Sequence, residues 1–103
     1  MWIIVLVVVR DGPRFLVVEE TRNRGWYMPA GRVDPDESLL EGAAREVREE
    51  SGLEVEFEGI LRIEHTPATA TYDARLRIVF LARPVGGTLK TVPDRESLGA
   101  RWV

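Results

Sequence analysis

The sequence predicts an α/β protein in which a mixed β-sheet packs against one long helix. Segments rich in β-branched residues, or with alternating polarity, lie before and after a single stretch of helical periodicity. Strands on both sides of one helix favour a mixed sheet with the helix on one face. A chain of 103 residues makes one domain, so we expect residues 1–103 to form a single unit with a small core.

The first two strands are predicted from residues 3–9 and 14–20. Residues 3–9 form a continuous β-branched run, which is typical of a strand buried on both faces. Asp11, Gly12 and Pro13 form a turn between the two strands. The apolar run has no basic segment before it and is too short to span a bilayer, so we expect no membrane contact and a cytoplasmic location.

Residues 21–29 are predicted to be a polar loop followed by a short extended segment. The loop carries Arg22 and Arg24, which are either solvated or in contact with the phosphates of a substrate. Trp26 either lines a substrate pocket or belongs to the core. These three residues are the substrate-binding candidates.

The helix is predicted over residues 39–51 because both of its ends carry capping signals. Ser38 and Glu41 form a capping box at the N-terminus. Gly52 suits the left-handed position that follows a helix.

The remaining elements are shorter. Residues 54–58 alternate and continue through a bulge at Gly59 into residues 60–63. We then expect a loop over 66–73, a strand over 74–81, a break over 84–87, a short extended piece over 88–92, an acidic loop over 93–97 and a last strand over 100–103.

Helical geometry at about 100° per residue divides the helix into three faces. One face should dock on the sheet: Leu40, Ala43, Ala44 and Val47. Three acids fall together beside it, with the helix's own cations on their far side: Glu46, Glu49 and Glu50, then Arg45 and Arg48.

The crowding of the three acids indicates a metal site. Like charges three or four residues apart repel each other, and acids near a helix C-terminus oppose the helix dipole. Divalent cations remove both conflicts, and carboxylate oxygens are the ligands that Mg²⁺ and Mn²⁺ prefer. The alternative is an ordinary charged helix, in which Arg45 pairs with Glu41 and Glu49.

The spacing of residues 31–53 carries a resemblance. The fixed positions are Gly31, five residues, Glu37, seven residues, Arg45-Glu46-Val47, one residue, Glu49-Glu50, one residue, Gly52-Leu53. This pattern resembles the Nudix box at every defined position of that signature. The resemblance implies a Nudix-type mixed sheet and hydrolysis of compounds that contain a nucleoside diphosphate, with Mg²⁺ or Mn²⁺ as the cofactor.

The resemblance also implies roles for individual residues. Glu46, Glu49, Glu50 and the backbone carbonyl of Ala30 would hold the metal, and Glu37 would pair with Arg45 to brace the loop that begins at Gly31. The base that takes the proton of the attacking water is either a box glutamate, Glu46 or Glu49, or a later loop acid. Glu96 resembles that loop acid and Asp94 is the second choice, whereas His65 is expected on the surface.

The composition limits the classes of molecule that this protein is expected to bind. The formal net charge of −3 does not fit a surface for a nucleic acid polymer, and the chain has no cysteine. We expect a small nucleotide as the substrate. The segments WYMPAGRVDPDE, VFLARPVGGTLKT and ESLGARWV further resemble the branch of the family that hydrolyses oxidised guanine nucleoside diphosphates.

Three readings of the function follow. The leading one is hydrolysis of a nucleoside di- or triphosphate; the others are hydrolysis of ADP-ribose or a dinucleoside polyphosphate, and a binding module without catalysis. Family members continue past the Trp102 strand into a further helix, which this chain lacks. Either the chain is C-terminally truncated or a second subunit, as in a homodimer, covers the exposed sheet face.

Overall fold

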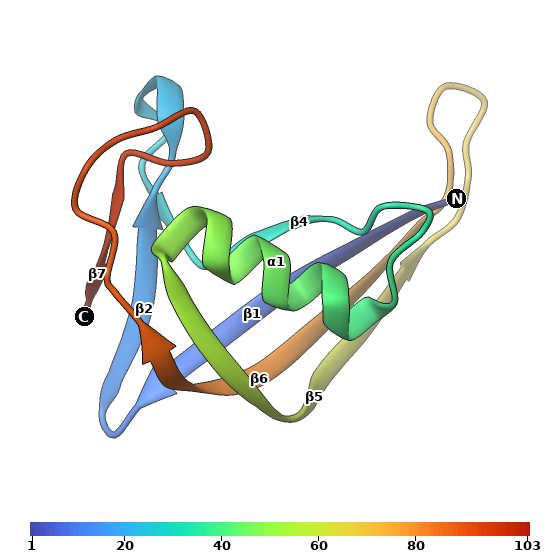
Figure 1. Ribbon diagram of the computed structural model, residues 1–103. Coiled ribbons are helices and arrows are strands. Elements are labelled where there is room, and N and C mark those ends of the chain that lie inside the picture. The colour runs from blue at the N-terminus through green and yellow to red at the C-terminus, as the bar shows by residue number, and fades with distance from the viewer.

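The computed structural model describes the backbone of residues 1–103 and every side chain except that of Asn23. The described chain forms seven strands, one α-helix and one short 3-10 turn (Figure 1). The bounds are β1 Trp2–Asp11, β2 Arg14–Glu19, η1 Thr21–Asn23, β3 Trp26–Tyr27, β4 Ala30–Arg32, α1 Leu39–Ser51, β5 Leu53–Thr66, β6 Arg75–Gly87 and β7 Gly99–Trp102.

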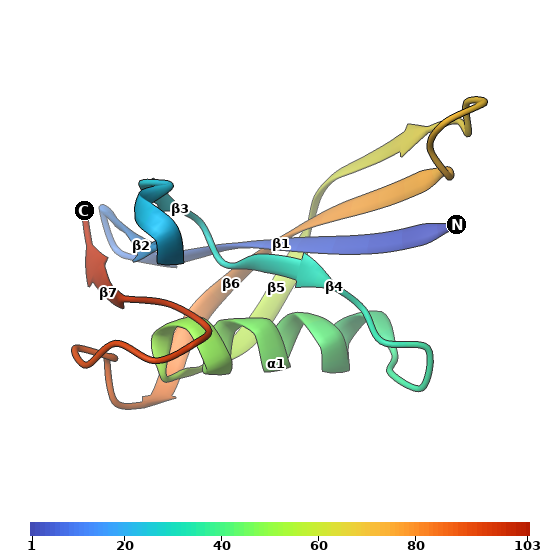
Figure 2. The same ribbon diagram turned by 90° about the horizontal axis from the view of Figure 1, so that it is seen from above.

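The predicted mixed sheet is confirmed. The strand order is β3-β2-β1-β6-β5, with β4 paired to β1 and β7 paired to β2. β1 and β6 are parallel and set Val5 beside Ile78, while the other pairs are antiparallel. Figure 2 shows α1 on one side of β1, β4 and β6, so the helix covers one face of the sheet.

The core lies between α1 and that face. Val5, Val7 and Val9 on β1 are fully buried and belong to one cluster with Ala43 and Val47 of α1. The alternate β1 residues are only half-buried. The prediction that β1 is buried on both faces is therefore wrong, because α1 covers only one face of the sheet.

The predicted helix and both of its caps are confirmed. The Ser38 hydroxyl accepts from the Glu41 backbone N–H, and the Glu41 side chain accepts from the Ser38 backbone N–H, each at 3.1 Å. Gly52 ends the helix with φ 79°. A side chain at Gly52 would also overlap the Thr88 backbone carbonyl, so the chain approaches this position closely.

The predicted docking face of α1 needs one correction. Leu40 is 50% exposed, whereas Gly42, Glu46 and Glu50 are buried with Ala43 and Val47. The buried stripe is turned towards the acids because β4 and the segment after it pack against that side of the helix. Gly42 lies against Val33 of that segment, where an added methyl group would meet the Val33 side chain at 3.0 Å.

Two further predictions differ from the structure. The strand predicted to break at residues 84–87 continues through them as part of β6, because Pro84 faces β5 in the register while β1 pairs only as far as Ala82. One side of this stretch is free, and a proline is tolerated there. Residues 88–92 form no strand, and β4 was not predicted. The register shift between Phe57 and Gly59 confirms the bulge.

No helix in the described chain is long and apolar enough to cross a membrane.

Candidate active site

The acids of α1 differ in their burial. Glu46 and Glu50 lie one helical turn apart and are 9% and 4% exposed. Glu49, between them in sequence, has 37% of its side chain exposed. β4 lies so close to the helix that a methyl group on Gly31 would overlap the Glu46 carboxylate. Glycine at this position therefore makes room for a carboxylate between α1 and β4.

Glu46 and Glu50 form a buried carboxyl pair. Burial, followed by the charge of Glu46, raises the pKa of Glu50 to about 9, and burial also raises the pKa of Glu46. The backbone N–H of Ala30 donates to Glu50 Oε2 at 3.2 Å, and the Tyr27 hydroxyl lies near the same carboxyl. Burial and the charge of Glu46 thus favour the protonated form of Glu50.

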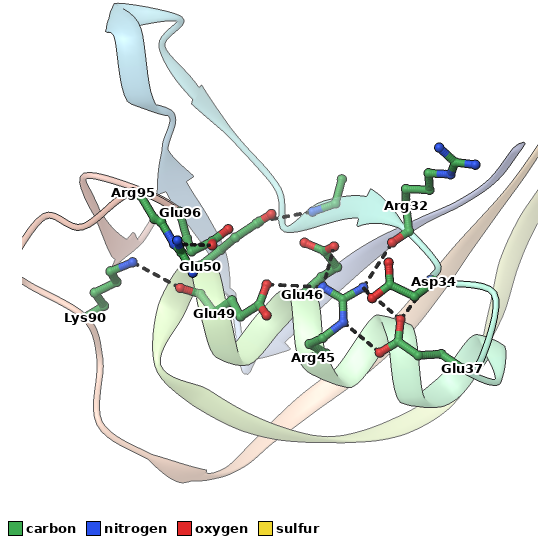
Figure 3. Close-up of polar contacts among 11 residues, drawn as sticks. Arg32, Asp34, Glu37, Arg45, Glu46, Glu49, Glu50, Lys90, Arg95 and Glu96 are labelled. Carbon is green, nitrogen blue, oxygen red and sulfur yellow. Dashed lines mark hydrogen bonds and ion pairs between the residues drawn. The ribbon is translucent and has the colours of Figure 1, made fainter.

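Arg45 joins the loop before the helix to the acids (Figure 3). Its guanidinium binds Glu37 in a bidentate manner at 2.7 and 2.9 Å, and its Nη2 donates to the Arg32 carbonyl at 3.0 Å. Its Nη1 donates to Glu46 at 3.0 Å and to Glu49 at 3.2 Å. The hydrogen bond from Arg45 lowers the pKa of Glu37 to about 2, and Glu37 in turn raises the pKa of Arg45.

The expected contact between Glu37 and Arg45 is therefore present, but the expected separation of Arg45 from the acids is wrong. The helical wheel places side chains by the direction of their first bond only. The Arg45 side chain is long enough for its guanidinium to contact both Glu46 and Glu49, which follow it by one and four residues. The acids are consequently divided into the pair Glu46 and Glu50, and Glu49, which binds Arg45.

The donor set fits a hard divalent cation, although the described residues contain no preformed cluster of three acidic or histidine ligands. The fit rests on the buried pair of Glu46 and Glu50, because two carboxylates in such a place need either a shared proton or a cation. The side-chain atoms that could ligate a metal are the carboxylate oxygens of Glu46, Glu49 and Glu50, and Mg²⁺ and Mn²⁺ prefer oxygen ligands. Ala30, the backbone candidate, lies beside this pair through its N–H.

The candidate bases lie on the loop between β6 and β7. Asp94 accepts hydrogen bonds from Lys90 Nζ and from the backbone N–H groups of Glu96 and Ser97, and the bond from Lys90 is the main reason for the lowered pKa of Asp94. Asp94 thus acts in holding the loop together. The Glu96 side chain is 41% exposed and lies 3.5 Å from Arg95 (Figure 3). The contacts described for the Glu96 carboxylate are limited to this ion pair, whereas the Asp94 carboxylate accepts hydrogen bonds from three donors.

The substrate-binding candidates lie around β3. Arg22 is exposed with φ 64°, and Arg24 lies 3.9 Å from Glu20. Trp26 is 43% exposed and stacks under the Arg101 guanidinium, 4.2 Å from the ring centre. These contacts do not link the three residues to the acids of α1. His65 is exposed on β5, as expected.

A pocket of about 660 Å³ lies under the loop that joins β5 and β6. Trp2, Ile4, Tyr72 and Arg75 are among its lining residues. Trp2 and Ile4 alternate with the β1 residues that face α1, so the pocket is on the opposite face of the sheet. Arg32 connects this pocket to the acids: its guanidinium stacks 4.1 Å above the Trp2 ring, while its carbonyl binds Arg45.

Sequence reasoning missed several residues of this site. Tyr27 is not among the predicted site residues, and it lies near Glu50, which is 23 positions later in the chain. The pocket around Trp2 also combines segments that are far apart in the chain. No local pattern marks such contacts, because they form only when the sheet assembles.

Comparisons with known proteins show which proteins this chain is similar to. The family model described as NUDIX domain matches residues 2–103. The chain is 41% identical over 106 residues to the 8-oxo-dGDP phosphatase NUDT18 of Homo sapiens, covering 98% of this chain and 31% of that protein. It is 39% identical over 95 residues to putative nudix hydrolase 1 of Caenorhabditis elegans, covering 89% of this chain and 25% of that protein.

A solved structure gives the same result for the fold. The NUDIX hydrolase from Nitrosomonas europaea superposes with a TM-score of 0.76 at 29% identity, covering 98% of this chain and 70% of that one. The chain spans about a third of the length of the NUDT18 proteins that it matches, at 31% of each.

Proposed function

The chain belongs to the NUDIX domain family and forms a Nudix-type hydrolase domain, and we propose that it is a Mg²⁺-dependent pyrophosphohydrolase acting on a nucleoside di- or triphosphate. The observation that carries the proposal is the buried pair of Glu46 and Glu50 beside β4. Such a pair is costly without a cation, and a cation is what hydrolysis of a diphosphate requires.

Each residue of the site has a proposed role in this reaction. Glu46, Glu50 and the backbone carbonyl of Ala30, whose N–H donates to Glu50, would hold the cation. Glu49 would join them on release from Arg45. Bound Mg²⁺ would neutralise the diphosphate and lower the pKa of a water molecule. Arg45 and Glu37 would fix the helix against the loop after β4. Glu96, Glu49 or Glu46 would accept the proton of the attacking water.

The pocket beside Trp2 is the place that we propose for the nucleobase. Its volume of about 660 Å³ is enough for a nucleobase, and the aromatic rings of Trp2 and Tyr72 line it together with polar side chains such as Thr66, Asp73 and Arg75. Arg32 lies between the two regions, because its guanidinium stacks on Trp2 and its carbonyl binds Arg45. The pocket and the acids are on opposite faces of the sheet, so a nucleotide with its base here would pass around the β4 edge to bring its phosphates to the acids. The similarity to an 8-oxo-dGDP phosphatase supports an oxidised guanine nucleotide as the first candidate.

The test is hydrolysis of a nucleotide panel with Mg²⁺, read as phosphate and pyrophosphate release. The panel contains normal and 8-oxo guanine di- and triphosphates, ADP-ribose and a dinucleoside polyphosphate. We expect Glu50→Gln to abolish hydrolysis, and Glu56→Gln, which removes an exposed carboxylate 3.0 Å from Arg83, to leave it unchanged. Equal rates for the parent and Glu50→Gln would refute the role of the pair.

The proposed partners are a small nucleotide and a second copy of the chain, in the cytoplasm. Three apolar side chains on the edge strand β5 are more than half exposed: Ile60, Leu61 and Ile63. Such side chains give the β5 end of the sheet an exposed apolar surface, and they support a homodimer that covers it. Light scattering on the parent and on Ile60→Ser tests this, and a monomeric parent would refute it.

A further inference from the structure

The segment that follows β6 closes the C-terminal end of α1. The carbonyls of the last residues accept hydrogen bonds from it: Glu49 from Lys90 Nζ at 3.0 Å, Glu50 from Ser97 Oγ at 2.6 Å, Ser51 from the Lys90 N–H at 2.8 Å and Gly52 from the Thr88 N–H at 3.2 Å. Helices end with unpaired carbonyls, which are most often capped by neighbouring residues. Here a segment about 40 residues away in the chain caps them.

Two side chains in this arrangement are placed on the peptides of the acids themselves. Ser97 is fully buried and Lys90 has 11% of its side chain exposed. Each uses its side chain to bind the carbonyl of an acid that we assign to the metal, Ser97 on Glu50 and Lys90 on Glu49. The positions of these two peptides set where the carboxylates lie, because each side chain is joined to its own backbone by only a few bonds.

Lys90 and Ser97 are also joined to each other. The Asp94 carboxylate accepts from Lys90 Nζ and from the Ser97 N–H, and the Lys90 carbonyl accepts from the Ala100 N–H at 3.0 Å. The Asp94 carboxylate also accepts from the Glu96 N–H at 2.8 Å. The segment that caps the helix therefore also holds the backbone of the candidate base.

We propose that Lys90 and Ser97 are positioning residues, which hold Glu49 and Glu50 through their backbone carbonyls and set these acids in register with Glu96. The inference rests on the proposed function, because it concerns the same acids. It differs from a general role in stability in one respect. Removing either side chain should weaken metal binding more than an equally destabilising change elsewhere on α1.

The experiment is a titration with Mn²⁺ without nucleotide, followed by electron paramagnetic resonance. We expect Ser97→Ala and Lys90→Met each to weaken Mn²⁺ binding by about tenfold, which is typical when a group that orients a metal ligand is lost. Lys90→Arg keeps the charge and the donor, so it should stay closer to the parent than Lys90→Met. Ser97→Ala and Lys90→Met affect different backbone carbonyls, so either variant can test the proposal if the other does not fold.

The matched control is Ser38→Ala, which removes the cap at the opposite end of the same helix. It should lower the melting temperature but leave Mn²⁺ binding at the parent level. Steady-state kinetics add a second readout, in which Ser97→Ala lowers kcat and leaves KM for the nucleotide unchanged. Parent-like Mn²⁺ affinity in both variants, or an equal loss in Ser38→Ala, overturns the proposal and leaves the proposed function intact. A parent that binds no Mn²⁺ overturns both.

Discussion

Glu46 and Glu50 lie one helical turn apart, and both carboxyls are buried beside β4. A methyl group on Gly31 would overlap the Glu46 carboxylate, and the Ala30 N–H of the same strand donates to Glu50. Because a cation would favour the ionised form of these carboxyls, we expect the metal-free and the metal-bound protein to respond differently to pH.

The stability of the metal-free protein should fall as pH rises from about 4.5 to about 9. Glu50 has an ordinary pKa of 4.5 and a folded pKa of about 9, so in this range the folded state binds the proton that the unfolded state has lost. The stabilisation is complete below pH 4.5 and is lost as pH approaches 9. Thermal melts in EDTA across this range measure it.

Glu50→Gln is the comparison for that measurement. The amide does not titrate, so its melting temperature should depend less on pH, and Mg²⁺ should raise the melting temperature of the parent at pH 8 but not that of the variant. Identical pH profiles for the two proteins would show that Glu50 ionises normally in the folded state.

Gly31→Ala should weaken Mn²⁺ binding and lower stability. The added methyl group would overlap the Glu46 carboxylate and move it from its place beside β4, and crowding in a buried site costs at most about 1–3 kcal/mol. Gly59→Ala is the matched control, because nothing lies within 4 Å of a methyl group there. Chemical denaturation and Mn²⁺ titration measure both effects. Equal behaviour of the two variants would mean that β4 can move away from the helix.

Arg45→Lys should lose activity although the charge is kept. Lysine cannot reproduce the bidentate bond to Glu37 together with the bonds to Glu46 and Glu49. We expect a fall of about tenfold in kcat/KM, as for other groups that orient metal ligands. Arg48→Lys serves as the control, since Arg48 makes one exposed pair with Glu54 at 3.8 Å. Full activity of Arg45→Lys would contradict the bracing role.

Trp2→Ala should raise KM for the nucleotide and leave Mn²⁺ binding unchanged. The prediction follows from the pocket that Trp2 lines and from its stacking with Arg32. Trp26→Ala provides the opposing case, because Trp26 is the aromatic candidate chosen from the sequence and stacks instead on Arg101. A larger rise in KM for Trp26→Ala than for Trp2→Ala would indicate that the nucleobase binds near β3 and not in the pocket beside Trp2.

The sequence by itself determined the elements whose signals are local. The Ser38 capping box, the Gly52 cap and the helix between them depend on contacts within about four residues. Such local contacts can be predicted from the sequence alone. The spacing of Glu37, Arg45, Glu46, Glu49 and Glu50 likewise identified the family.

Only the tertiary structure decided how those residues are used. β4 packs beside α1 and thereby buries Glu46 and Glu50, while Leu40, which has the right helical phase for the core, is left half exposed. Arg45 lies among the acids because its side chain is long enough to reach Glu37 and Glu49 together. Ser97 and Glu50 are 47 residues apart, and only the closed sheet brings them into contact. Local hydrogen bonding selects the helix, whereas the environment of its carboxylates depends on segments that the sequence order does not place nearby.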